Sequence, residues 1–60
     1  MPTYEEELAR KIFRERNPDD DWDRPAKARE ADGTVDEMEA DFVREHYLAI
    51  ARDRIRRGQA

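Results

Sequence analysis

The sequence predicts an all-α fold in which two main helices form an antiparallel hairpin, joined by an acidic, proline-bracketed loop and a short middle helix. Apolar residues recur at three- and four-residue spacing towards both ends of the chain, as they do on one face of a helix. A Thr-x-x-Glu capping pattern opens each of these segments. Strand-like alternation is absent. Sixty residues suffice for one small domain, so we expect residues 1–60 to form a single helical unit.

The first helix is expected over residues 3–17. Thr3 is followed three residues later by Glu6, which predicts the N-terminal cap. Asn17 stands directly before Pro18, and a residue in that place is pushed out of helical geometry, which ends the helix. The apolar stripe of this helix consists of Tyr4, Leu8 and Ile12.

The connection between the helices has two parts. Residues 18–25 form the proline-bracketed loop, in which Trp22 stands among four aspartates. We interpret Trp22 as an anchor that pins the loop onto the helices, and an exposed binding hot spot is the alternative. Residues 26–32 are rich in alanine and predict a short helix of about two turns, with Gly33 as its stop.

The last helix is expected over residues 34–57. Thr34 and Glu37 repeat the capping pattern, and Gly58 is the expected stop. One broad face carries Val35, Met38, Phe42, Val43, His46, Ala49 and Ile50, while Tyr47, Leu48, Ala51 and Ile55 fall outside that face. An apolar surface that extends this far around a helix predicts contact with more than one element, or with another chain.

The composition excludes several classes of protein. The chain has no Cys and no Ser, so disulfides, cysteine zinc sites and Ser or Cys nucleophiles are excluded. His46 is the only imidazole, and a chain this small offers little concavity, so we expect no enzyme activity and no cofactor. No apolar run approaches a membrane span and no signal-peptide pattern opens the chain, so we expect a cytoplasmic protein without membrane contact.

The chain has few side chains that can form a hydrophobic core. Leu, Ile, Val and Phe together number nine, and chains of this length are marginally stable alone. A partner would add buried area, so we predict a small acidic protein–protein interaction module, with a homodimer as an open alternative. The predicted partner-binding residues are Trp22, Phe42, His46, Tyr47 and Ile50.

Charge is divided along the chain. Residues 1–41 carry seven basic and fourteen acidic side chains, whereas residues 42–60 carry five basic and two acidic ones. Acids at helix starts and arginines at a helix end complement the helix dipole, which explains much of this division. The alternative function is a nucleic-acid-binding or regulatory module that uses Arg52, Arg54, Arg56 and Arg57. Nucleic acid is the less favoured partner, because these arginines do not share one face and no aromatic residues lie between them.

Residues 28–39 resemble the calcium loop of the EF-hand family. Gly33 falls at the position of the sharp turn, and Val35 falls at the position that is usually apolar. The resemblance implies calcium ligands at Glu30, Asp32, Asp36 and Glu39. The sequence departs from the pattern at the first ligand, where Ala28 offers no side-chain oxygen, and a helix stop followed by a helix start explains the same residues without a metal.

A wider resemblance covers most of the chain. Trp22 between aspartates, followed by Arg44-x-x-Tyr47-x-x-x-Ala51, is similar to a pattern in short helical proteins of actinobacteria and their phages. These proteins are mostly without assigned function. The resemblance implies a compact helical fold in which Trp, Tyr and Ala join the helices. It also implies a phage or mobile-element origin, but no activity. A phage-encoded modulator of a host protein fits the small size, the acidity and the lack of catalytic groups.

Overall fold

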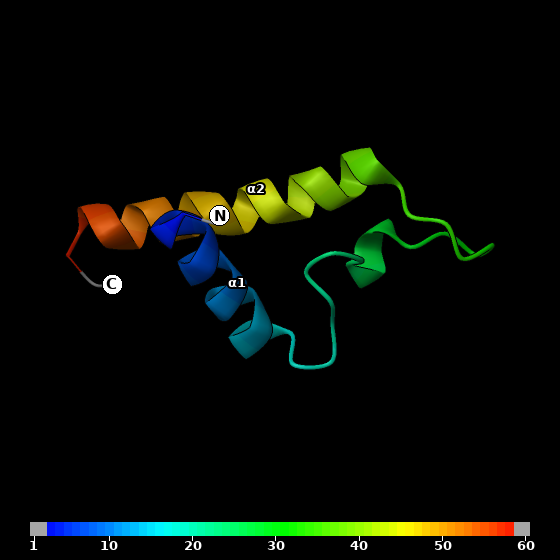
Figure 1. The fold of residues 1–60 in the computed structure, drawn as a ribbon, viewed down its shortest axis with the longest axis horizontal. Helices are drawn as coiled ribbons and strands as arrows, with labels where there is room; N and C mark the ends of the chain where they lie inside the picture. Colours follow the sequence, from blue (N-terminus) through cyan, green and yellow to red (C-terminus); the bar gives the residue numbers. More distant parts are fainter. Residues whose placement is uncertain (1–2, 59–60) are drawn as a thin grey trace.

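The computed structural model describes residues 3–58, which form two α-helices and one turn of 3-10 helix (Figure 1). Helix α1 spans Tyr4–Arg16, the turn η1 spans Ala26–Ala28, and helix α2 spans Glu37–Arg56. Within these residues the only β pairing is an isolated antiparallel bridge. The two helices pack against each other, so the predicted all-α helical hairpin is confirmed. The ends of the predicted domain, residues 1–2 and 59–60, lie outside the described residues.

Helix α1 begins and ends close to the predicted positions. The Thr3 hydroxyl accepts a hydrogen bond from the backbone N–H of Glu6 at 3.1 Å, as a capping residue does. At the other end, the backbone N–H of Asn17 donates to the carbonyl of Phe13 at 2.8 Å. Pro18 follows, and the helix stops there because Asn17 leaves helical geometry.

The connection departs from the predicted helix over residues 26–32. After η1 the chain forms a small hairpin, in which the N–H of Glu30 donates to the carbonyl of Thr34 at 2.9 Å. The N–H of Asp36 donates to the carbonyl of Ala28 at 2.8 Å. These pairings across the hairpin take the backbone groups that a helix would use. Gly33 has φ +90°, so its conformational freedom serves the hairpin turn and does not end a helix.

Helix α2 starts three residues later than predicted. Asp36 is the cap, and its carboxylate accepts hydrogen bonds from the backbone N–H groups of Met38 at 3.1 Å and Glu39 at 3.3 Å. Thr34 is unavailable for that role, because it pairs with Glu30 in the hairpin. The predicted end is close to the observed one, and Gly58 after it has φ +72°.

The core lies where α1 crosses α2. Ala9 of α1 and Ala51 of α2 are fully enclosed, and Ile12 is buried beside them. Small side chains at the crossing allow the two helix backbones to approach closely. Around this centre pack the partly buried side chains of Leu8, Trp22, Tyr47, Leu48 and Ile50.

The connection is fixed against the N-terminal part of α2. Figure 1 shows α1 diverging from α2 and the chain returning through η1. Arg44 of α2 holds the loop, because its Nε donates to the carbonyl of Trp22 at 3.2 Å and its Nη2 to that of Asp23 at 2.8 Å. Two residues of the connection itself, Pro25 and Ala28, are buried. One side of α2 is therefore covered by α1 and by the connection, while its last turns extend beyond α1 (Figure 1).

Candidate functional site

Two large apolar side chains on α2 are left uncovered. Met38 is 73% exposed and Phe42 is 69% exposed. Residues four apart on a helix are neighbours, so the two form one continuous patch, which we call the α2 ridge. The ridge is exposed because α1 and the connection pack on the side of α2 that carries Ala40 and Ala51. Position 40 is about 200° around the helix from position 38, so Met38 faces solvent.

Carboxylates border the α2 ridge. Asp41 and Glu45 line a shallow depression together with Met38 and Phe42. Arg44 pairs with Asp41 at 3.1 Å, but its guanidinium also donates to the loop carbonyls, so it is directed away from the ridge. The ridge is therefore an apolar surface with carboxylates along its edge.

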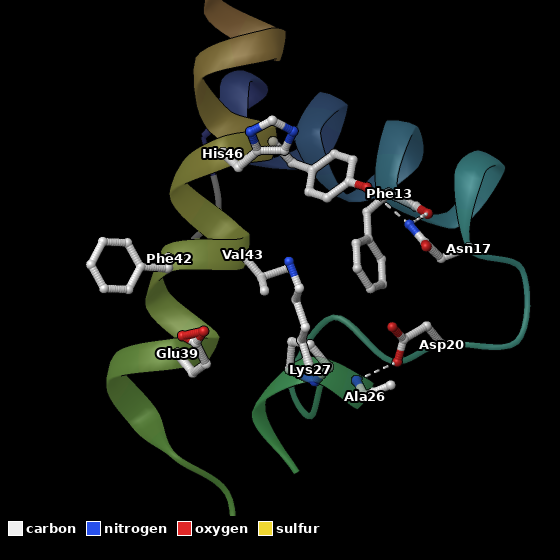
Figure 2. A pocket seen from close by; sticks show the side chains of 11 residues that line it. Phe13, Asn17, Asp20, Ala26, Lys27, Glu39, Phe42, Val43 and His46 are labelled. Atoms are coloured by element: carbon white, nitrogen blue, oxygen red, sulfur yellow. Dashed lines mark hydrogen bonds between the residues drawn. The ribbon is translucent and has the colours of Figure 1, made fainter.

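A hollow of about 520 Å³ lies beside the ridge, between the C-terminal end of α1, the loop, η1 and α2. Figure 2 shows Lys27 and Val43 extending into it, whereas the ring of Phe42 points away from it. Its lining residues are Phe13, Asn17, Asp20, Pro25, Ala26, Lys27, Glu39, Phe42, Val43, His46 and Tyr47. Asp20 is already engaged, since its carboxylate accepts the backbone N–H of Ala26 at 2.8 Å. The hollow thus has a mixed polar and apolar lining.

The predicted partner-binding residues divide into two groups. Phe42 and His46 are exposed on the same stretch of α2. The remaining three, Trp22, Tyr47 and Ile50, are partly buried against the core. The predicted set omits Met38, although its place four residues before Phe42 is a signal that sequence reasoning could have used.

The environment of Trp22 is that of an anchor. Its ring meets Phe13 edge-on, with centroids 5.7 Å apart. The guanidinium carbon of Arg10 lies 5.9 Å from the centroid of the Trp22 ring. The indole ring therefore contacts both an aromatic side chain and a cation. These contacts bind the loop to α1 and place Trp22 away from the α2 ridge.

The arginines of the alternative nucleic-acid surface do not all face free solvent. Arg52 pairs with Glu5 of α1 at 3.1 Å, and Arg57 pairs with Asp53 at 3.1 Å. Arg54 lines a separate depression with residues of α1. Two members of the predicted set Arg52, Arg54, Arg56 and Arg57 therefore each form an exposed ion pair with a carboxylate within the chain.

The four carboxylates of the EF-hand-like segment, Glu30, Asp32, Asp36 and Glu39, are not gathered around one point. Across residues 3–58, no group of three or more His, Cys, Asp or Glu side chains is arranged to hold a metal ion. Asp36 caps α2, and Asp32 accepts hydrogen bonds from the hydroxyl of Thr34 at 2.7 Å and its backbone N–H at 3.0 Å. These two bonds from Thr34, the hydroxyl first, lower the pKa of Asp32.

No family model matches the chain, and no curated protein or solved structure matches it. Neither helix in the described residues has the length and apolar character needed to cross a membrane.

Proposed function

We propose that this chain is a non-enzymatic protein–protein interaction module that binds its partner through the α2 ridge. The exposure of Met38 and Phe42 carries this proposal. Burying a side chain of this size yields about 1.5–3 kcal/mol. A chain with only nine Leu, Ile, Val and Phe residues that leaves Phe42 outside its core has not used that free energy in its own folding.

The composition of the ridge supports the same function. Aromatic residues and Met are enriched at protein interfaces, and Met adapts its shape to the partner. The helix that carries the ridge is also held in the fold, because Ala40 and Ala51 on its opposite side are buried. A preorganised anchor loses little conformational freedom on binding, which favours affinity.

Catalysis receives less support than binding. Two of the carboxylate and amide groups around the hollow serve the fold, since Asp20 accepts the backbone N–H of Ala26 and Asn17 donates to Tyr47. His46 stands exposed with its ring edge-on to Tyr47 at 5.2 Å. Nucleic-acid binding also receives less support, because Arg52 and Arg57 pair with carboxylates. The resemblance to short phage and actinobacterial proteins favours a phage-encoded modulator that acts on a host protein.

Site-specific photo-crosslinking tests the proposal. Benzoylphenylalanine replaces Phe42 in one version of the protein and Tyr4 in a second, which is the matched control. Tyr4 is also an exposed aromatic residue, at 58%, but it lies on α1. Both versions are expressed in the cells that naturally contain the protein, and adducts are separated by electrophoresis.

We expect a discrete adduct from position 42 that is absent from position 4. An excess of unlabelled wild-type protein should suppress it, whereas an excess of the Phe42→Ser variant should not. The absence of an adduct at position 42, or the same adducts from both positions, would contradict the proposed function. Circular dichroism confirms that the variants keep their helices.

A further inference from the structure

We infer that the occupant of the α2 ridge is a cationic, amphipathic segment of another protein, with Lys or Arg side chains on both sides of a large apolar residue. This inference rests on the proposed function and adds the chemistry of the partner. Three observations support it: the charge around the ridge, the direction of the Arg44 side chain away from the ridge, and the positions of the carboxylates around the helix.

The N-terminal half of α2 is strongly acidic. Residues 37–45 carry four acidic side chains and one basic side chain, and the acids are Glu37, Glu39, Asp41 and Glu45. The one base, Arg44, is committed to the loop and to Asp41, and its side chain is only 22% exposed. Among the described residues no ion pair involves Glu37, Glu39 or Glu45. Asp41 is paired with Arg44, so the carboxylates available to a partner are those of Glu37, Glu39 and Glu45, and Lys27 lines the same hollow as Glu39.

The carboxylates lie on both sides of the ridge. With about 100° per residue, Asp41 and Glu45 fall on one flank of Met38 and Phe42, and Glu39 falls on the other. Asp41 and Glu45 line the depression beside the ridge, whereas Glu39 lines the hollow on its far side. An apolar stripe with basic residues on both edges is the complementary surface, and a basic amphipathic helix presents one.

A second copy of the chain fits this surface less well. Two ridges packed side by side in the same direction would bring their carboxylates together, and like charges in an interface cost free energy. The reversed arrangement would need the arginines near the end of α2. Arg52 and Arg57 already pair with Glu5 and Asp53, and Arg54 lines a depression beside α1. Of these four arginines, only Arg56 is both exposed and outside any such contact among the described residues. The phosphates of nucleic acids or anionic lipids would meet the same carboxylates and be repelled.

Binding of defined peptides tests the charge requirement. The probe is a fluorescent amphipathic peptide of Leu and Lys, compared with a Leu and Glu peptide of the same pattern and a Ser and Lys peptide of the same charge. Fluorescence anisotropy measures the dissociation constants at low and high salt. We expect the Leu and Lys peptide to bind most tightly, and its affinity to fall as salt rises.

Matched variants separate the ridge from the overall charge of the protein. Phe42→Ser should weaken binding of the Leu and Lys peptide about tenfold, as for a hot-spot residue. The double variant Glu39→Gln, Glu45→Gln should weaken it about threefold or more. The control double variant Glu7→Gln, Glu15→Gln removes the same charge from exposed positions on α1 and should leave the affinity unchanged. Equal losses in the two double variants, or equal binding of the Leu and Glu peptide, would overturn the inference.

The crosslinking experiment distinguishes this inference from the proposed function. Mass spectrometry of the adduct at position 42 identifies the attached segment of the partner. A segment with basic residues on both sides of an apolar one supports the inference. A neutral or acidic segment, or a second copy of this chain, overturns the inference and leaves an interaction through the ridge established. An absent adduct contradicts the proposed function itself.

Discussion

Asn17 donates its side-chain amide to the hydroxyl oxygen of Tyr47 at 3.0 Å, and this bond ties the end of α1 to the middle of α2. The same amide nitrogen donates to the carbonyl of Phe13 at 3.1 Å. The ring of Tyr47 meets Phe13 edge-on, with centroids 5.2 Å apart. One asparagine thus satisfies the end of a helix and also orients the aromatic residue that forms part of the hollow.

Removing the Tyr47 hydroxyl should weaken this link while leaving the ring contact. We expect Tyr47→Phe to lower the free energy of unfolding by about 0.5–1.5 kcal/mol, the net value of a hydrogen bond. Urea denaturation followed by Trp22 fluorescence measures it. The double variant Asn17→Ala, Tyr47→Phe should lose less than the two single variants added together, because both changes remove the same bond. Strict additivity would show that the two side chains act independently.

The guanidinium of Arg44 should be worth more to stability than an exposed ion pair. We expect Arg44→Gln to cost about 1.5–3 kcal/mol, because its charged donors hold two loop carbonyls. The emission of Trp22 should shift to longer wavelength as the loop loosens. The control is Arg52→Gln, which breaks an exposed pair with Glu5 and should cost about 1 kcal/mol or less. Similar losses in both variants would mean that Arg44 does not hold the loop.

A larger side chain at the point where the two helices cross should destabilise the fold. Ala51 is fully enclosed against α1, so we expect Ala51→Leu to destabilise the fold by about 1–3 kcal/mol through overpacking. Ala49 lies on the same helix but is exposed, and Ala49→Leu should leave stability nearly unchanged. Thermal denaturation followed by circular dichroism compares the two. If Ala51→Leu were tolerated as well as Ala49→Leu, the helices would not approach closely at this position.

The turn at Asp32 should open in acid. Hydrogen bonds from Thr34 lower the pKa of Asp32 in the folded chain, so its carboxylate stabilises the turn above the ordinary aspartate pKa of about 3.9. That contribution is lost as pH falls through the lower pKa of the folded state. The chemical shift of the Thr34 amide proton, followed by NMR during acidification, should therefore have its midpoint below the ordinary value. Asp32→Asn should abolish this titration, and a midpoint at or above the ordinary value would exclude the bonds.

Sequence reasoning was reliable where the signals are local. Thr3 and Asn17 bracket α1 as expected, because a cap and a following proline act on their immediate neighbours. It was wrong at Thr34, where the capping pattern was present but the backbone paired with Glu30 in a hairpin. The same hairpin replaced the predicted helix over residues 26–32, since pairing with residues across the turn took its hydrogen-bonding groups.

The amino-acid sequence by itself determined the helical class, the bounds of α1 and the division of charge, because these depend on spacing and on neighbours in the chain. Only the tertiary structure decided which apolar residues of α2 are enclosed. Apolar side chains surround much of that helix, and the covered side depends on where α1 and the connection pack. Tyr47 and Ile50 were drawn towards the core by that packing, while Met38 and Phe42 were left at the surface.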